Sequence, residues 1–401
     1  MEIPTPIFKR KLEDKLVKFL DDETAIAVHG ARQVGKTYIL YSLIRHLEAE
    51  KAQTVYLDLE DPLLLTDLNQ GYQNLLKLLL ARGVNMAQKV YVLIDEIQYL
   101  DNPSSFIKLL ADHHKTVHLI VSGSSTFAVK SKFKDSLAGR IVDFELFPLD
   151  FEEYLSFKGL KYDLAQVTST VVTNELIGLY QEFVRFGGYP RISLTDSVEK
   201  KKVYLNQIID NYLRKDIRDL GRIENLAKFN SLLFVLASQS GQMLNVARLS
   251  KETGISVPTL DKYLFLLEET YILKLVTPFS KNPHVEIVKS PKIFFYDSGL
   301  AGLLWLRDFP QTVIGNLFET SVFSQYVKKY SKSNLFYWRT KNKQEIDLVY
   351  NMMPIEVKLN FDSIDRSAIN SYLSKYRISQ YCIVGLLGSK KPAGHIYPWE
   401  I

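Results

Sequence analysis

Between residues 24 and 148, short runs of apolar residues alternate with amphipathic helical patterns. Helical spacing predicts helices near residues 36–48, 63–82 and 103–114. Strands that read as continuous apolar runs, separated by helices, are typical of a parallel sheet covered on both faces, so this part of the chain predicts an α/β fold. The five predicted strands are TAIAVHG (24–30), TVYLDLE (54–60), VYVLIDEIQ (90–98), VHLIVSGSS (117–125) and IVDFELF (141–147).

The pattern changes after residue 150. Residues 151–222 are helical and charged, as a solvated helical face would be. From residue 226, three helical patterns precede two apolar strands, YILKLVTPF (271–279) and PKIFFYD (291–297), and Asn245 and Ser256 are the expected N-caps of the second and third helices. This is the outline of a winged helix-turn-helix. The helix that would enter DNA carries Lys262 but also Asp261, and an acid there repels phosphates, so DNA reading and protein contact both stay open.

The last ninety residues predict a second α/β segment. The sequence WRTKNKQEIDLVYNMMPIEVKL (338–359) reads as two strands joined by a short turn, and NLFETSVFSQYVKKY (316–330) is an amphipathic helix before them.

Composition sets the broad class of the protein. With 401 residues, 46% of them hydrophobic, we expect two or three domains. No apolar run reaches the roughly 18 residues that span a bilayer, and the first residues lack the apolar core of a signal peptide, so we expect a cytoplasmic protein without a membrane partner. The single Cys382 excludes an internal disulfide, and a net charge of +5 permits contact with nucleic acid without arguing for it.

The segment GARQVGKT lies where the first strand meets a helix and matches the phosphate-binding loop G-x-x-x-x-G-K-[ST] at every fixed position. Such a loop points backbone N–H groups at the β- and γ-phosphates, its lysine reaches those phosphates, and its hydroxyl residue binds Mg²⁺. A glycine-rich turn would explain the two glycines but not the lysine and threonine that follow. The predicted site for ATP or GTP consists of Gly30, Ala31, Arg32, Gln33, Val34, Gly35, Lys36 and Thr37.

Two acids end the third apolar run. Asp95 is the expected outer partner of Mg²⁺ beside Thr37, and Glu96 is the expected catalytic base that orients water, with Lys36 as the other catalytic group. The alternative is that Asp95 and Glu96 only cap the next helix.

Two further residues are candidates for the nucleotide site. In AAA-type ATPases a polar residue at the end of the fourth strand senses the γ-phosphate, and Ser124 is our candidate among residues 122–125, with a plain Ser/Gly turn as the alternative. Arg140 is a candidate arginine finger for a neighbouring subunit's nucleotide, which would make the protein a homo-oligomer, whereas a solvated or ion-paired arginine is the alternative.

The segment RFGGYPR (185–191) is a candidate hinge or nucleotide sensor, because Gly187 and Gly188 free the backbone.

The C-terminal strands carry a second set of ionisable residues. Alternation places Glu345 and Asp347 on one face of the first strand, and Glu356 and Lys358 on one face of the next. An acid, an Asp and a Glu-x-Lys are the arrangement of Mg²⁺-dependent phosphodiesterases, in which carboxylates hold the metal and the lysine steers water. An exposed Glu/Lys pair on an edge strand is the alternative. Basic residues that precede the acids of these strands either collect phosphates or form a solvated loop: Lys328, Lys329, Lys332, Arg339, Lys341 and Lys343.

In this order, GARQVGKT, VLIDEIQ, VSGSS, LAGR, FGGYP and EIDLVY…PIEVK resemble a widespread prokaryotic family that joins an AAA-type ATPase domain to a C-terminal domain of the restriction-endonuclease-like, PD-(D/E)xK, superfamily. The resemblance covers nearly the whole chain. It implies a metal set of Glu319, Asp347 and Glu356 in the tail, with Glu356 and Lys358 as catalytic residues.

The expected architecture is α/β with three parts. These are a P-loop NTPase (AAA-type) parallel sheet with a helical extension over residues 1–200, a helical and winged-helix connector over 201–300, and an α/β restriction-endonuclease-like domain over 301–401. We expect ATP and Mg²⁺ as cofactors and a nucleotide state that controls a tail acting on or binding DNA. The alternative is an ATP-driven switch whose tail is catalytically silent and binds a protein or nucleic-acid partner.

Overall fold

The computed structural model describes residues 3–22, 24–124, 137–211, 223, 225–279, 290–330, 334–388, 391–392 and 394–401. These form two compact units, Met1–Phe147 and Pro148–Ile401. The expected boundaries near residues 200 and 300 differ from this division, because the helices that follow residue 150 pack within the second unit.

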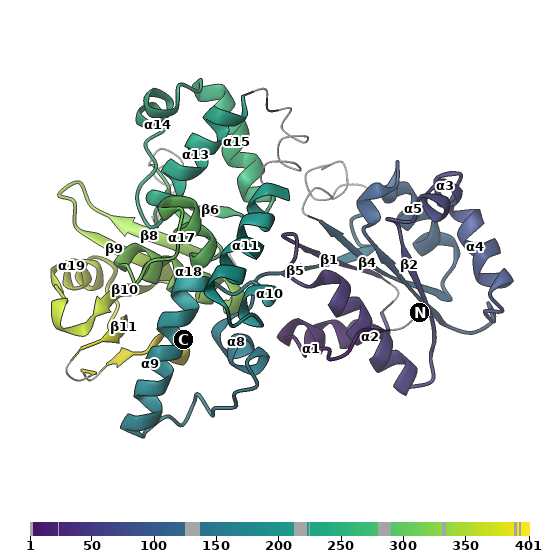
Figure 1. Ribbon diagram of the computed structural model, residues 1–401, viewed down its shortest axis with the longest axis horizontal. Helices are drawn as coiled ribbons and strands as arrows, with labels where there is room; N and C mark the ends of the chain where they lie inside the picture. Colours follow the sequence, from purple (N-terminus) through teal and green to yellow (C-terminus); the bar gives the residue numbers. More distant parts are fainter. Residues whose placement is uncertain are drawn as a thin grey trace. The chain divides into compact units, whose positions relative to one another are not determined.

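The first unit is built on a five-stranded parallel sheet with the strand order β2-β3-β4-β1-β5 (Figure 1). All five strands lie where the sequence predicts them. β1 and β3 are buried along their whole length, as their continuous apolar sequences require. The strands are β1 (Ala25–Gly30), β2 (Gln53–Asp58), β3 (Val90–Asp95), β4 (Val117–Ser124) and β5 (Ile141–Leu146).

Helices cover both faces of this sheet. Alternate strand residues on one face pack with α4 and α5, and the opposite face carries α2. The helices are α1 (Lys11–Val17), α2 (Lys36–Ala49), α3 (Pro62–Asn69), α4 (Tyr72–Ala81) and α5 (Pro103–His113). The single helix expected over residues 63–82 is therefore two helices. Gly71 separates them because its φ of 141° is incompatible with a helix.

The second unit contains a mixed five-stranded sheet in the order β12-β11-β10-β9-β8. β9 is antiparallel to its neighbours β8 and β10, whereas β10, β11 and β12 are parallel. The strands are β8 (Leu335–Arg339), β9 (Glu345–Tyr350), β10 (Met353–Asn360), β11 (Cys382–Leu387) and β12 (His395–Ile396). Around this sheet lie α18 (Gly315–Tyr330), α19 (Ser367–Tyr376) and two 3₁₀ turns, η4 (Phe361–Ser363) and η5 (Pro398–Glu400).

Helices and a small sheet make up the rest of this unit. Three helices precede the antiparallel pair of strands β6 (Leu273–Val276) and β7 (Lys292–Phe295), as the sequence predicts, and the Asn245 side chain caps the second of them by accepting from Arg248 N. The three are α13 (Leu226–Ser238), α14 (Val246–Thr253) and α15 (Val257–Glu269). The other helices are α8 (Phe151–Phe157), α9 (Thr170–Phe186), α10 (Pro190–Ser193), α11 (Val198–Ile208) and α17 (Ser298–Leu306).

The segment expected as a hinge or nucleotide sensor is a close-packed elbow inside the second unit. The fully buried carboxylate of Asp297 accepts hydrogen bonds from Gly188 N at 2.7 Å and Leu300 N at 2.8 Å. Gly299 lies so close to the end of α9 that an added Cβ would stand 2.1 Å from the Phe186 carbonyl oxygen. Gly187 and Gly188 in this segment, and Gly299 in α17, therefore permit close approach where α9 ends and α17 begins.

The charged stretch expected as a solvated face is not solvated throughout. Lys201 on α11 is buried, with its ammonium 3.3 Å from Glu182 and 4.6 Å from the centre of the Phe186 ring. Residues 212–222, which complete that stretch, lie outside the described part of the chain. Within the described ranges, no helix combines the length and apolar character needed to cross a bilayer.

The elbow predicts an asymmetric response to alanine substitution. Gly299→Ala should lower the free energy of unfolding of the second unit by about 2–3 kcal/mol, because the new methyl group meets backbone atoms that cannot rotate away. Gly178→Ala is the matched control: Gly178 lies within α9 with nothing within 4 Å of an added Cβ, so alanine should stabilise by about 0.5–1 kcal/mol.

The measurement is urea unfolding followed by tryptophan fluorescence. All three tryptophans, Trp305, Trp338 and Trp399, belong to the second unit and report on it selectively. Equal midpoints for the two variants would contradict the close approach at Gly299.

Candidate functional site

The loop GARQVGKT connects the carboxyl end of β1 to α2. The loop turns sharply because Gln33 and Gly35 have positive φ values of 61° and 99°. Only glycine adopts the second of these readily, which explains the second fixed glycine of the pattern. Lys36 and Thr37 are the first residues of α2, so the helix begins where the sequence predicts.

The Lys36 ammonium folds back over the mouth of the loop. It donates to the carbonyl oxygens of Gly30 at 3.2 Å and Ala31 at 2.9 Å, and the residue is only 6% exposed. These two carbonyl oxygens are neutral, so a phosphate oxygen in the same place would be a stronger acceptor. The donors of the loop therefore fit an anionic phosphate chain.

Arg10, which the sequence did not single out, braces the loop from the opposite side. Its guanidinium donates to the carbonyl oxygens of Val34 at 2.8 Å and Phe147 at 2.9 Å, and the residue is buried. The end of β5 also touches the loop directly, because a Cβ on Gly30 would lie 2.2 Å from the Leu146 carbonyl oxygen. The loop is thus fixed to the last strand of the sheet by one side chain and one backbone contact.

Asp95 lies at the carboxyl end of β3. Strand β4 separates β3 from β1, the strand that leads into the loop. Asp95 Oδ1 accepts from Glu96 N at 3.1 Å and from the Ser122 hydroxyl, and its Oδ2 accepts from the Tyr56 hydroxyl at 3.2 Å. Burial and the Asp95 charge raise the pKa of Tyr56, so this hydroxyl stays a donor. Three donors hold the Asp95 carboxylate in one orientation.

Glu96 adopts a left-handed backbone conformation, with φ 53° and ψ 45°. This conformation is uncommon for a residue with a side chain and concentrates at functional sites. The Gln98 amide donates to the Glu96 carboxylate and fixes its direction. Glu96 begins a 3₁₀ turn (Ile97–Tyr99) without a side-chain cap hydrogen bond, which argues against the alternative that it serves only as a cap.

Ser124 and Arg140 are expected to contact the nucleotide, but the structure does not place the side chain of either beside the loop. The Ser124 backbone pairs with Gly30 at the edge of the loop, but its side chain lies outside the described part of the structure, and Ser122 is the serine that reaches Asp95. Arg140 precedes β5 and pairs with Asp112 at 2.6 Å. Because Ala25 pairs with Ile141 and Gly30 with Leu146, Arg140 lies at the opposite end of the strands, about 17 Å from the loop. Contact with the chain's own nucleotide is excluded, and a role at a neighbour's nucleotide stays a prediction.

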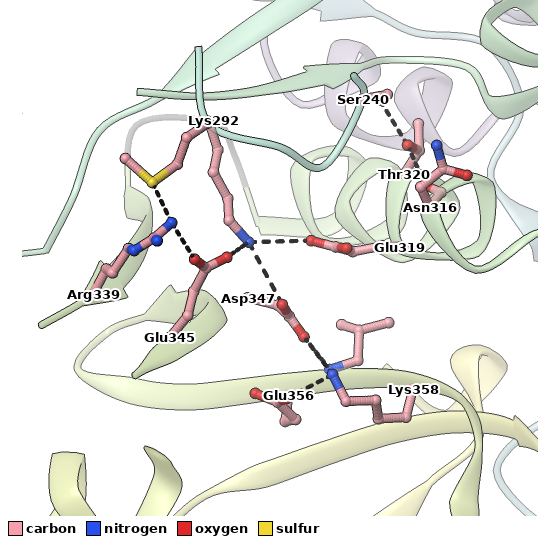
Figure 2. Close-up of polar contacts among 12 residues, drawn as sticks. Ser240, Lys292, Asn316, Glu319, Thr320, Arg339, Glu345, Asp347, Glu356 and Lys358 are labelled. Carbon is pink, nitrogen blue, oxygen red and sulfur yellow. Dashed lines mark hydrogen bonds and ion pairs between the residues drawn. The ribbon is translucent and has the colours of Figure 1, made fainter. Parts of the chain in front are cut away.

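A second cluster of charged residues lies in the C-terminal unit (Figure 2). The structure brings together the four residues that the sequence singled out, Glu319 on α18, Asp347 on β9, and Glu356 and Lys358 on β10. It adds one that was not expected, Lys292 at the start of β7.

Lys292 lies at the centre of the cluster. Its Nζ is 2.6 Å from Glu345 Oε1, and Glu319 Oε1 and Asp347 Oδ1 stand at 3.4 Å and 3.5 Å. The residue is 1% exposed. Burial disfavours its charge, but the three carboxylates outweigh burial and raise the pKa of Lys292 above its ordinary value.

Lys358 forms the second half of the cluster. Its Nζ is 2.8 Å from Glu356 Oε1 and 3.8 Å from Asp347 Oδ2, and the same Asp347 oxygen accepts from Val357 N at 2.9 Å. Burial raises the pKa of Glu356 to about 7 and that of Glu319 to about 8, with the Asp347 charge adding to both shifts. Glu356 Oε2 is buried and has no hydrogen-bond partner among the described residues.

The predicted metal ligands Glu319, Asp347 and Glu356 thus share a cluster but not a common point. Within the described ranges, no group of three or more His, Cys, Asp or Glu side chains is arranged to hold a metal ion. A divalent cation such as Mg²⁺ needs oxygens at about 2.0–2.1 Å around one centre. Here the inward-facing oxygens of Glu319 and Asp347 surround an ammonium, so the side chains as they stand do not fit a divalent ion.

Three of the six basic residues expected to collect phosphates have other partners. Arg339 binds Glu345 at 3.0 Å, and Lys328 and Lys329 donate to backbone carbonyls. Lys341 and Lys343 are exposed in the turn between β8 and β9. Lys332 lies outside the described residues.

Comparison with protein families assigns a description to each part of the chain. Residues 22–155 match the model of an AAA domain, so the chain carries an AAA-type domain. Residues 177–312 and 314–392 match two domains of unknown function (DUF8612 and DUF4143).

Similar proteins come from archaea and bacteria. An uncharacterized protein of Methanocaldococcus jannaschii is 28% identical over 353 residues, which are 86% of this chain and 75% of that protein. One of Mycobacterium tuberculosis is 24% identical over 403 residues, which are 98% of this chain and 82% of that protein. Solved structures include CDC6P from Pyrobaculum aerophilum (12% identity, TM-score 0.30, 72% of this chain and 92% of that one) and AMPPCP-bound DnaA from Aquifex aeolicus (16%, 0.28, 67% and 90%). With TM-scores this low, neither likeness bears on function.

The brace at Arg10 predicts a local loss of stability. Arg10→Met keeps much of the apolar stem but leaves the Val34 and Phe147 carbonyls without this donor, so the first unit should lose about 3 kcal/mol of unfolding free energy. It should also bind ATP more weakly, because the loop is no longer held in shape.

Lys9→Met is the matched control, since Lys9 pairs with Asp14 on the surface and such pairs contribute little. Unfolding followed by far-UV circular dichroism reads both units, and tryptophan fluorescence should show the second unit unchanged. A loss of the same size in Lys9→Met and Arg10→Met would refute the role of the brace.

Proposed function

We propose that this chain is a Mg²⁺-dependent ATPase. One observation carries the proposal: the phosphate-binding loop and the acids of β3 meet at the same edge of a parallel sheet, which is where such sheets bind ligands. The match to an AAA domain over residues 22–155 supports the same function.

In the proposed reaction, the loop amides and Lys36 bind the β- and γ-phosphates. Lys36 would exchange two carbonyl partners for phosphate oxygens with little movement, because its ammonium already lies over the mouth of the loop. The Thr37 hydroxyl and Asp95 would hold Mg²⁺, which supplies positive charge to the phosphates as the bond breaks. Asp95 suits an outer position, because its oxygens already accept three hydrogen bonds.

Glu96 is the proposed catalytic base. The uncommon backbone conformation of Glu96 and the hydrogen bond from the Gln98 amide hold its carboxylate in one direction. The carboxylate can therefore orient water without a further loss of side-chain entropy. We retain Ser124 as a γ-phosphate sensor and Arg140 as a finger toward a second copy of the chain; both roles extend the proposal without carrying it.

For the C-terminal unit, we propose a fold like that of restriction endonucleases, under the control of the nucleotide state. In support, an acid-bearing helix, three antiparallel strands, a helix and a parallel strand follow one another in this unit, and the resemblance implies such a domain here. On this basis the unit acts on or binds DNA.

A second candidate has its own support. The ammonium among the carboxylates favours a catalytically silent fold, in which the unit binds a protein or nucleic-acid partner while ATP drives a switch. The three helices and paired strands β6 and β7 supply the outline of a winged-helix module for that contact. The exposed face of α15 carries both Asp261 and Lys262, so it does not distinguish between the two kinds of partner.

Glu96→Gln should retain ATP affinity within about threefold but lower ATP turnover at least about 100-fold, because the loop is intact while the water-orienting carboxylate is gone. Glu60→Gln is the control, since Glu60 is an exposed acid that follows β2 at the same sheet edge and should leave turnover near that of the parent. Phosphate release and nucleotide binding are measured on the same preparations. Parent-like hydrolysis by Glu96→Gln would remove Glu96 from the mechanism.

One assay distinguishes the two functions proposed for the C-terminal unit. Supercoiled DNA and single-stranded DNA and RNA are incubated with the full chain, ATP and Mg²⁺ or Mn²⁺. The silent fold predicts intact nucleic acid, whereas nicking that disappears in both Asp347→Ala and Lys358→Ala would establish a hydrolytic unit. ATP turnover with and without DNA, measured in parallel, tests whether the partner is a nucleic acid.

A further inference from the structure

Lys292 is an unusual residue for its position. It begins β7, whose other residues are all buried and apolar, and it pairs with Val276 of β6 on one side and bridges to Met243 on the other. A side chain with full charge is almost never buried in such a place unless opposite charges compensate it. The compensation must therefore come from the residues that its ammonium reaches.

Those residues are the acids of the proposed nuclease-like site. Glu319 comes from α18, and Glu345 and Asp347 come from β9, and all three stand within 3.5 Å of the Lys292 Nζ (Figure 2). In the described part of the chain, Lys292 is the cation within ion-pair distance of Glu319. A divalent ion at this site would need the same inward-facing oxygens.

The charges of the cluster are nearly balanced with Lys292 present. When every group is counted as ionised, the four acids Glu319, Glu345, Asp347 and Glu356 face the cations Lys292, Lys358 and Arg339, which leaves one formal negative charge. Without Lys292 the cluster would carry two, and three carboxylates would lose a neighbouring cation. That charge and those ligands are what a hard divalent cation prefers.

A direct role of Lys292 in gripping a phosphate does not fit its surroundings. The side chain is 1% exposed, so a substrate cannot touch its ammonium in this arrangement. Lys358 differs, because 34% of its side chain is exposed. Lys292 faces the acids from inside the unit, and Lys358 faces them from a more open side.

We infer that the Lys292 ammonium takes the place of the divalent metal in this carboxylate cluster, so that the C-terminal unit as folded excludes such an ion. The inference rests on the proposed nuclease-like site and states what keeps a metal out of it: a divalent site forms only when the Lys292 ammonium leaves the cluster. Its failure would not affect the ATPase proposal, because the test uses nucleotide-free protein.

The test is Mn²⁺ binding to the full chain, measured by the electron paramagnetic resonance signal of free Mn²⁺. Lys292→Met removes the charge and keeps most of the volume. It should bind one Mn²⁺ per chain at least about tenfold more tightly than the parent, and adding Asp347→Asn should abolish the gain. Lys274→Met, on the neighbouring strand, removes a lysine paired with Glu268 outside the cluster and should bind Mn²⁺ as the parent does.

Two results would overturn the inference. One is Lys292→Met that folds, as judged by circular dichroism, and gains no site. The other is a parent that already binds Mn²⁺ in a manner lost with Asp347→Asn. If Lys292→Met does not fold, the double variant Lys292→Met with Glu319→Gln is used in its place, because it buries one charge fewer. The comparison of the parent with Asp347→Asn needs no lysine variant at all.

Discussion

The second unit depends on one ion cluster, in which the Lys292 ammonium meets acids from α18 and β9. Without a cation between them, Glu319, Glu345 and Asp347 would repel one another in an environment with little water to screen them. With it, the small sheet that contains β7 is joined to the large sheet and to the helix that precedes it. The acids that look like a catalytic set are thus also part of what holds these three elements together.

Each candidate site holds a buried lysine, and the contacts of the two lysines differ. Lys36 donates to two neutral carbonyl oxygens, which a phosphate can replace at little cost. Lys292 rests on carboxylates, and separating them would leave the Lys292 ammonium and the Glu319 carboxylate without this ion pair in a buried place. The first arrangement suits a site that binds and releases its ligand repeatedly, whereas the second suits a fixed contact. This difference separates the two units more clearly than their sequence motifs do.

The sequence predicts a feature well when the residues that form it lie close together along the chain. The five parallel strands, the loop and the Asn245 cap depend on residues close together in the chain, and these were predicted. Arg10 binds carbonyls 24 and 137 residues away, and Lys292 meets Glu319 across 27 residues, so no local pattern announces either contact. Ser122 reaches Asp95 because Ile94 pairs with Val121, and neither strand alone reveals the register between the two. The apolar periodicity continues through Gly71, so the sequence predicts one helix over residues 63–82. The Gly71 backbone is not helical, and the structure therefore has two helices there.

The contact between Gly30 and the Leu146 carbonyl changes how the loop motif should be interpreted. A side chain at position 30 would collide with the last strand of the sheet whether or not a nucleotide is bound. Descendants of this chain that had abandoned ATP would therefore still keep this glycine, as a requirement of the sheet. Lys36 and Thr37 carry no comparable steric demand, so drift at these two positions, and not at the first glycine, would mark a relative that has lost its ligand.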